Sequence, residues 1–490
     1  MTADILVLAD RLWRGDASVT EFHPVSHLGG LAEICPGVAF LPAFANITAI
    51  QTEDGLVLVD TGSAFVARRN HEELRRWTDQ RLNTAIYSHG HIDHVFGVGS
   101  FEVEAAERGW PAPVVVAHEA LPRRFDRYRM TTGYNEVINQ RQFGVRGLRW
   151  PTEYRYPDRT YASELALEVG GTAFALRHEK GETDDHTVTW LADRKVLCCG
   201  DLFIWASPNA GNPQKVQRYP LEWAQALRRM AALRPEYLLP GHGLPVIGAD
   251  RVAVALADTA ELLEALVSQT LAVMNGGGRL DEAIHSVTVP RHLVDRPYLK
   301  PVYDEPEFVV RTVWRQYGGW WDGNPATLKP APERALAVEL AQLAGGAAAL
   351  AARAVALAEA ALVERAAEWE SGHAGARGHA GNALPDPRVA ALRGGEEELR
   401  LAGHLAELAW LAAPDDGRVR AARHRVFTVR AERATSTMSV GVYRWAAGES
   451  LGDPLAPPAD APPADAPPAD APPSGARRPD RRADDDDAGS

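Results

Sequence analysis

Cysteine is scarce in this chain, which argues against the disulfide frameworks that hold small secreted proteins together. The 490 residues include three cysteines, Cys35 and the adjacent pair Cys198 and Cys199. Because the pair follows an apolar run, we expect buried, reduced thiols. An excess of basic residues is also lacking, since the formal net charge is −13. A negative protein does not attract phosphate backbones, so we expect no nucleic-acid partner.

Long apolar runs are lacking as well. A membrane-spanning helix needs roughly 18 unbroken apolar residues, and even the Ala-rich stretch at 345–363 is interrupted by Arg353 and Glu359. Residues 1–10 have neither the basic start nor the apolar centre of an export signal. We therefore expect a soluble, cytoplasmic protein without a membrane span.

The first half of the chain alternates short apolar runs with charged stretches. The runs at 38–41, 47–50 and 56–59 predict successive strands, and the charged segment 70–81 predicts a helix that leads into a strand at 84–87. Such alternation is typical of α/β layering, in which functional loops gather at one edge of a sheet. We therefore expect an α/β fold for this half.

Three imidazoles and one carboxylate follow the run 84–87 within six residues, as His89, His91, Asp93 and His94. No packing requirement asks for that combination. The spacing His-x-His-x-Asp-His places side chains on both sides of a tight turn, so one pair can face one cation and the next pair a second cation. A chance cluster of surface histidines is the alternative.

Four more polar residues stand at the ends of predicted strands. Asp60 follows the run 56–59, where it can hold the second nitrogen of a ligand histidine or bond only its own turn. His186, Asp201 and His242 lie at strand ends farther along the chain. A single strand-end His or Asp is usually structural, but three of them after the His-x-His-x-Asp-His motif indicate a shared metal site.

Seven candidate ligands suffice for two cations. We expect His89, His91 and His186 at one cation, Asp93, His94 and His242 at the other, and Asp201 as a bridge between both. Imidazoles with few carboxylates favour two Zn²⁺ ions, although Fe or Mn fit such ligands. Two cations about 3.5–4 Å apart lower the pKa of a shared water toward ~7, so the expected nucleophile is a metal-bridging hydroxide that cleaves an ester-type bond. Asp93 and Asp201 are the expected catalytic residues, with Asp93 orienting the attacking oxygen.

The order of these residues resembles that of the metallo-β-lactamase superfamily. The resemblance rests on Asp60-Thr61-Gly62, the His-x-His-x-Asp-His motif, His186, Asp201 and His242, and it covers roughly residues 35–245. It implies an αβ/βα sandwich of two mixed sheets, with these residues as metal ligands. Redox members that hold two irons usually carry Glu at the second motif position, so His91 favours hydrolysis.

A second resemblance is narrower. Tyr134-Asn135, Asn139-Gln140-Arg141 and the Trp-rich segment 314–325 resemble the alkyl sulfatases and their helical dimerisation domain. This resemblance implies a homodimer and an alkyl sulfate ester as substrate. It also implies that Tyr134, Asn135 and Arg141 line the substrate pocket, and that Lys215 or Arg218 holds an anionic head group.

Two other functions stay open. Alkyl sulfatases tend to carry glutamates at the positions that we assign here to His186 and Asp201. The difference favours a lactone, thioester or β-lactam hydrolase of the broad superfamily. The other interpretation is a metal-stabilised dimeric scaffold without turnover.

We divide the chain into a catalytic domain at 1–250, a helical dimerisation domain at 251–445 and a tail at 446–490. In the helical part, Leu336, Leu340 and Leu343 recur at helical spacing, which predicts a core-facing stripe. The tail consists largely of Pro-Pro-Ala-Asp repeats with too few apolar residues to fold, so we expect it to be disordered. The polar and aromatic segment 122–145 is predicted as a wall over the metal site, with a solvated helical face as the alternative.

Overall fold

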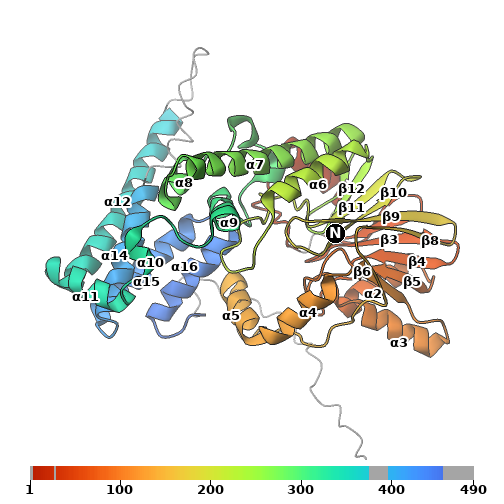
Figure 1. The fold of residues 1–490 in the computed structure, drawn as a ribbon, viewed down its shortest axis with the longest axis horizontal. Helices are drawn as coiled ribbons and strands as arrows, with labels where there is room; N and C mark the ends of the chain where they lie inside the picture. Colours follow the sequence, from red (N-terminus) through yellow and green to blue (C-terminus); the bar gives the residue numbers. More distant parts are fainter. Residues whose placement is uncertain (1–3, 27–28, 375–394, 456–490) are drawn as a thin grey trace, which may run out of the picture.

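The structure is a computed structural model that describes residues 4–26, 29–374 and 395–455. Two mixed β-sheets stack face to face, helices cover their outer faces, and a helical part extends to one side (Figure 1). This arrangement is the αβ/βα sandwich with an appended helical domain that the sequence implied, and the predicted fold class is confirmed.

The first sheet has the strand order β1-β2-β3-β4-β5-β6-β7. Its strands are β1 (Ala32–Cys35), β2 (Val38–Leu41), β3 (Ile47–Thr52), β4 (Gly55–Val59), β5 (Leu82–Ile86), β6 (Val114–His118) and β7 (Arg159–Tyr161). The pairs from β1 to β4 are antiparallel, and the pairs from β4 to β7 are parallel. Parallel strands end at the same edge, so the residues that follow β4 and β5 meet there.

The second sheet has the order β13-β12-β11-β10-β9-β8. Its strands are β8 (Glu164–Val169), β9 (Thr172–Glu179), β10 (His186–Leu191), β11 (Val196–Gly200), β12 (Tyr237–Pro240) and β13 (Val246–Ile247). The pair β11 and β12 is parallel, and the other pairs in this sheet are antiparallel. Asp201 and His242 therefore leave neighbouring strands at the same edge.

Both faces of β4 are buried, which explains its continuous apolar run. Val57 and Val59 join the core between the sheets, whereas Leu56 and Leu58 join the core under α2 (Ala67–Trp77) and α3 (Val98–Arg108). The apolar cluster between the sheets also includes residues of three helices that cover the second sheet. They are α1 (Ile5–Arg14), α6 (Pro220–Ala232) and α7 (Ala249–Asn275).

Helices make up the remainder of the described chain. Two of them, α4 (Leu121–Met130) and α5 (Thr132–Phe143), connect the sheets to the helical part (Figure 1). The others are α8 (Leu280–Ser286), η1 (Arg291–Leu293), η2 (Pro297–Leu299), α9 (Pro306–Gly318), α10 (Pro325–Leu328), α11 (Glu333–Leu343), α12 (Ala347–Ala374), α14 (Glu396–Ala412), α15 (Gly417–Arg433) and α16 (Thr437–Ser450). Helices α11, α12, α14 and α15 share two apolar clusters of their own. Val309 and Val313 of α9 instead join the core of the sheets.

Two local predictions differ from the structure. Residues 446–450, expected at the start of the tail, form the last turn of α16, because Ser436 caps the helix and alanines favour its continuation. The leucines of α11 do not face a core in this chain: Leu336, Leu340 and Leu343 are exposed. Residues 451–455 of the predicted tail follow α16 as turns, and residues 456–490 lie outside the described residues.

Within the described residues, no single helix combines the length and the apolar character of a membrane span. Helix α11 and residues 347–362 of α12 reach both together, but they bend by 87° at the break between them.

Candidate metal centre

The His-x-His-x-Asp-His loop lies where edges of the two sheets meet. It leaves β5 beside Asp60, and Ser88 O accepts a hydrogen bond from Thr187 N of β10 at 2.6 Å. Gly241 N donates to Gly200 O at 2.7 Å, which brings the ends of β11 and β12 together. Side chains from both sheets therefore converge on one buried space.

Two groups of ligand atoms form in this space. The first group is His89, His91, Glu182 and Asp201, and the second group is Asp93, His94 and His242. In each group, one ligand atom per residue lies within 4.8 Å of all the others. His89 Nε2 is 2.7 Å from His91 Nδ1 in the first group, and His242 Nε2 is 3.4 Å from Asp93 Oδ2 in the second. One cation can therefore contact every member of a group.

Asp201 faces both groups, as a bridging ligand must. Its Oδ2 lies 3.6 Å from His89 Nε2 and 3.3 Å from His242 Nε2, and its Oδ1 lies 3.4 Å from His94 Nε2. A Cβ atom on Gly241 would lie only 2.1 Å from Asp201 Oδ1, so a glycine leaves the space that this carboxylate fills. The position of Asp201 is consistent with the predicted bridge.

His186 joins neither group, which differs from the predicted ligand set. Its Nε2 accepts a hydrogen bond from Asp201 N at 3.1 Å, and its ring stacks on that of His89 with 5.1 Å between centroids. Burial lowers the pKa of His186 to about 4, so the ring is neutral. The lone pair of His186 Nε2 already accepts a hydrogen bond from the backbone N–H of Asp201. His186 therefore orients Asp201 instead of facing a cation. Glu182, four residues earlier, takes its place in the first group.

Hydrogen bonds to Asp60 determine which imidazole nitrogen faces the groups. His94 Nδ1 donates to Asp60 Oδ2 at 2.8 Å. Ser88 Oγ donates to the same oxygen at 2.7 Å, so this hydroxyl can only accept from His89 Nδ1, which lies 2.9 Å away. His89 and His94 therefore present the lone pair of Nε2, and Asp60 has the contact that was predicted for it.

His242 is held from the other side of the space by the loop that follows β2. Its Nδ1 donates to the carbonyl oxygen of Phe44. Asn46 Nδ2 donates to Pro240 O at 3.0 Å and to Gly243 O at 2.9 Å, which fixes the turn on both sides of the histidine. The lone pair of His242 Nε2 is thus also aimed at the ligand groups.

Burial keeps the imidazoles of the first group neutral. It is the largest cause that lowers the pKa of His89 and of His91 well below the ordinary value. The neighbouring His94 ring adds to the effect on His89, and Arg218 adds to the effect on His91. Neutral imidazole is the form that binds metal ions, so no proton has to leave these rings.

The carboxylates are crowded, and a cation would relieve that crowding. Burial, followed by the nearby Asp201, raises the pKa of Glu182 well above its ordinary value, although Arg218 Nη2 lies 3.2 Å from Glu182 Oε1. Burial also opposes ionisation of Asp201, but the rings of His242 and His94, which are protonated while no cation is bound, hold its pKa well below the ordinary value. A cation that binds their Nε2 atoms would take the place of these protons. The two carboxyl groups share one space and oppose each other's ionisation, and a cation between them would offset this repulsion.

The donor set fits a pair of divalent cations. His94 Nε2 and Asp201 Oδ1 are buried and have no hydrogen-bond partner among the described residues, and a bound cation would supply one. Imidazole nitrogens with carboxylate oxygens are donors that Zn²⁺ accepts, and that Fe and Mn also accept.

Segment 122–145 folds as α4 and α5 and buries part of its polar side chains. Arg124 of α4 and Asn139 of α5 are buried, whereas Tyr134 is 61% exposed. Asn135 is buried, and its Nδ2 donates to Thr131 Oγ1 at 2.8 Å within the helical segment. The structure thus gives Tyr134 and Asn135 no described contact with the ligand groups.

Lys215 lies within electrostatic reach of two ligand carboxylates, Asp93 and Glu182. Its Nζ donates to Asn139 Oδ1 at 3.0 Å and lies 5.6 Å from the centroid of the Trp150 ring. Burial, followed by the charge of Arg218, lowers the pKa of Lys215 to about 7. Arg218 itself is buried and tied to Glu182, so it neutralises a ligand carboxylate.

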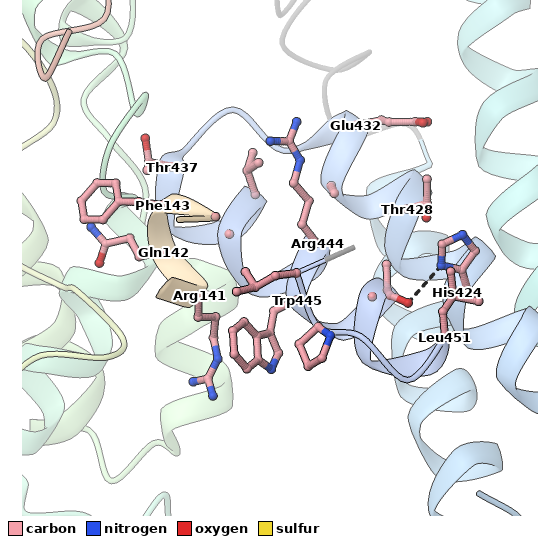
Figure 2. A pocket seen from close by; sticks show the side chains of 18 of the residues that line it. Arg141, Gln142, Phe143, His424, Thr428, Glu432, Thr437, Arg444, Trp445 and Leu451 are labelled. Atoms are coloured by element: carbon pink, nitrogen blue, oxygen red, sulfur yellow. Dashed lines mark hydrogen bonds between the residues drawn. The ribbon is translucent and has the colours of Figure 1, made fainter. Parts of the chain in front are cut away.

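Arg141 lies in a different cavity. Figure 2 shows its side chain beside Trp445, in a cavity of about 490 Å³ formed by residues of α5, α15 and α16. The guanidinium carbon is 5.1 Å from the Trp445 ring centroid, and Nη1 donates to Gln214 Oε1 at 3.0 Å. None of the described lining residues belongs to a ligand group, and Gln142 in this lining donates a hydrogen bond to Tyr303 Oη at 3.0 Å.

Two residues of the site escaped the sequence reasoning. Glu182 lies four residues before His186, the predicted ligand. The signal that could have identified Glu182 is an acidic side chain just before the same strand. Tyr303 comes from the helical half: burial, followed by the carboxylates of Glu182, Asp93 and Asp201, raises its pKa well above the ordinary value. No local pattern marks Tyr303, because it follows the last ligand at a long distance in sequence.

Two family models match this chain. Residues 41–242 match the metallo-beta-lactamase superfamily. The sheet domain belongs to the metallo-β-lactamase superfamily. Residues 279–373 match the alkyl sulfatase dimerisation family. The chain thus joins a metallo-β-lactamase domain to an alkyl sulfatase dimerisation domain, and both resemblances seen in the sequence are confirmed.

Alkylsulfatases are among the relatives of this metallo-β-lactamase domain protein. A linear primary-alkylsulfatase from Pseudomonas sp. is 26% identical over 319 residues, covering 61% of this chain and 60% of the relative. An (R)-specific secondary-alkylsulfatase from Pseudomonas sp. is 26% identical over 336 residues, covering 63% of this chain and 51% of the relative. The chain therefore spans between about half and three fifths of the length of these curated relatives.

A solved structure shows the same fold. The stereoselective inverting sec-alkylsulfatase from Pseudomonas sp. superposes with a TM-score of 0.71 at 22% identity, covering 87% of this chain and 66% of that one. The likeness extends through the helical part as well as the metallo-β-lactamase domain.

Proposed function

We propose that this chain is a metal-dependent hydrolase that cleaves alkyl sulfate esters with a pair of divalent cations. The observation that carries the proposal is the meeting of two ligand groups at one carboxylate, Asp201, which contacts both. The match to the alkyl sulfatase dimerisation family and the names of the curated relatives support the sulfate ester as substrate.

The charge of the centre suits an anionic ester. The two groups contain three carboxylates, from Asp93, Glu182 and Asp201, and Arg218 neutralises one of them, so two divalent cations would leave an excess of positive charge at the centre. A sulfate monoester carries one negative charge and is attracted to such a centre. Lys215 adds a half-buried ammonium below about pH 7. A neutral lactone or carboxylic ester would gain nothing from this balance.

The residues of the chain have separate tasks in this hydrolysis. When bound, two divalent cations would lower the pKa of a shared water toward ~7 and polarise the ester oxygens, so that water can attack at neutral pH. Asp201 holds the two groups together, and Asp93 lies where it can orient the attacking water. Asp60 keeps His94 in the required tautomer. The ammonium of Lys215 donates hydrogen bonds to the sulfate oxygens.

Glu182 favours the sulfatase function over the rest of the superfamily. Alkyl sulfatases tend to have glutamates at the two later ligand positions, and the ligand set that includes His186 departed from this pattern twice. With Glu182 in the first group, Asp201 is the one ligand of the two that still differs from the alkyl sulfatase pattern.

A lactone, thioester or β-lactam hydrolase is the second candidate. One observation favours it: a metallo-beta-lactamase type 2 from Bacillus sp. is 24% identical over 204 residues, covering 41% of this chain and 66% of the relative. Asp201 in place of a second glutamate points the same way.

A panel of hydrolase substrates tests the proposal. Purified protein loaded with Zn²⁺ or Mn²⁺ is given a primary and a secondary alkyl sulfate, a lactone, a thioester and a β-lactam, and released sulfate, acid and thiol are measured. We expect sulfate release that disappears in Asp201→Asn. Acid or thiol release without sulfate would favour the second candidate. No turnover with any substrate would refute the enzyme and favour a dimeric scaffold.

We also propose that the chain forms a homodimer through its helical part. Figure 1 shows α11 and α12 at the end of the molecule that lies away from the sheets. Leu336 and Leu343 of α11 are exposed in the single chain, and exposed apolar side chains on one helix are suited to a partner surface. Light scattering that shows a monomer at micromolar concentration would contradict this proposal.

A further inference from the structure

We propose that Arg124 and Asp185 are positioning residues that fix the backbone amide of Gly90 and thereby set the separation of His89 and His91. We call Arg124, Asp185 and the Gly90 amide the amide clamp. The inference rests on the proposed metal site, but it does not depend on which ester is the substrate.

The contacts of the amide clamp are direct and buried. Gly90 N donates to Asp185 Oδ2 at 3.0 Å, and Arg124 Nε donates to Asp185 Oδ1 at 2.9 Å. Arg124 is 3% exposed and Asp185 is 0% exposed. Asp184 also pairs with the guanidinium, through Arg124 Nη2. The carboxylate of Asp185 therefore has one oxygen on the metal loop and the other on helix α4.

The glycine between the two histidines is explained by this contact. A Cβ atom on Gly90 would lie 2.8 Å from Arg124 Cδ and 3.1 Å from Asp185 Oδ2. Gly90 is not in the left-handed region, so its backbone conformation does not itself require glycine. What requires it is the close approach of the clamp.

The amide clamp acts on the geometry of the first ligand group. Gly90 is the single residue between His89 and His91, whose facing ring nitrogens are 2.7 Å apart. A shift of its amide changes the direction of both side chains. Because Arg124 belongs to α4, the helical segment over the site holds the metal loop in place, although none of the clamp side chains is a ligand.

A purely structural ion pair would have a different effect. Loss of a buried partner would then lower the unfolding temperature but leave the cation affinity of the folded protein unchanged. A positioning pair lowers the affinity itself, because the ligand atoms no longer converge. Partners of ligand residues typically account for about 10–100-fold in metal affinity.

The first test compares Arg124→Met with Arg123→Met. Arg123 is the preceding residue of α4, is exposed and has no described ion pair, so its variant is the matched control. Zn²⁺ and Mn²⁺ affinities are measured by competition with a chromophoric chelator, at a temperature where circular dichroism shows each protein folded. We expect a loss of about 10–100-fold for Arg124→Met and wild-type affinity for Arg123→Met. Equal affinities for wild type and Arg124→Met would overturn the inference.

A double-mutant cycle with Gly90→Ala makes the test specific. In the wild-type background the added Cβ meets Arg124 Cδ, so we expect Gly90→Ala alone to weaken cation binding. In the Arg124→Met background the methyl group finds more room, and its effect should shrink. Additive effects would contradict the clamp.

Conservative variants keep the inference testable if Arg124→Met does not fold. Arg124→Lys keeps the charge but loses the planar guanidinium, and Asp185→Asn keeps an acceptor for Gly90 N but loses the charge. We expect both to bind cations more weakly than wild type, and wild-type affinity in both would overturn the clamp. Absence of sulfate release from a wild-type protein that binds two cations would refute only the substrate.

Discussion

Asp60→Asn is the substitution that tests the metal centre with the least disturbance elsewhere. Asp60 has φ 59°, in the left-handed region, which Asp and Asn tolerate better than most other residues. Asparagine therefore keeps the backbone and the size of the side chain. What it loses is one of two accepting oxygens and the negative charge.

The magnitude follows from the contacts of the carboxylate. Oδ1 accepts from Ser88 N at 2.7 Å, and Oδ2 accepts from Ser88 Oγ at 2.7 Å and from His94 Nδ1 at 2.8 Å. If the amide oxygen of Asn stays on Ser88 N, the other two bonds are lost. Buried hydrogen bonds to a charged group contribute about 1.5–3 kcal/mol each, so we expect the free energy of unfolding of the metal-free protein to fall by roughly 3 kcal/mol or more.

The loss for cation binding is a separate quantity. Without its acceptor, His94 no longer holds the tautomer that presents Nε2, and the affinity should fall about 10–100-fold, which corresponds to about 1.4–2.8 kcal/mol. Chelator competition measures the affinity, and thermal unfolding in the presence of EDTA measures the stability. Asp79→Asn, at an exposed aspartate, is the control for loss of one charge. Wild-type affinity in Asp60→Asn would refute the reasoning that this carboxylate orients His94.

Further predictions concern the ligand set, the substrate and the dimer. Glu182→Gln should reduce the bound metal from two ions to one, whereas His186→Ala should leave two, as measured by elemental analysis. The reverse outcome would show that His186, and not Glu182, is the metal ligand. Because burial lowers the pKa of Lys215 to about 7, its ammonium is present below that pH and lost above it. KM for an alkyl sulfate should therefore rise between about pH 6 and about pH 8 in the wild type, and Lys215→Met should have a high KM at both. At Leu343, which is 78% exposed, substitution by Asp should shift the protein toward monomer in sedimentation velocity, and an unchanged sedimentation coefficient would place the dimer surface elsewhere.

The His-x-His-x-Asp-His motif could be interpreted without the structure because its candidate ligands lie close together in the sequence. His89 to His94 supply four polar donors within one turn, and apolar runs on either side identify the strand that positions them. The residues that complete the centre are far apart in the chain. For these, sequence reasoning found the correct strand ends, with Asp201 and His242 facing the groups.

The sequence did not show which of two nearby side chains, Glu182 or His186, belongs to the first ligand group. Glu182 and His186 stand on one short segment, and both are metal-binding side chains. The structure separates them because the backbone amide of Asp201 occupies the lone pair of His186 Nε2. Arg141 and Lys215 differ for a similar reason, since α5 turns one residue toward Trp445 while Lys215 reaches Asn139 on the same helix.

The sequence by itself determined the layered α/β fold, the helical domain and the loop that carries the candidate metal ligands. Each of these depends on periodicity or on residues close together in the chain. Only the tertiary structure decided which carboxylate completes the first ligand group and that Arg124 and Asp185 hold Gly90. Such features are distances between atoms of different strands and helices. Periodicity reports which face a side chain occupies, but it does not report which lone pair on that face is already taken.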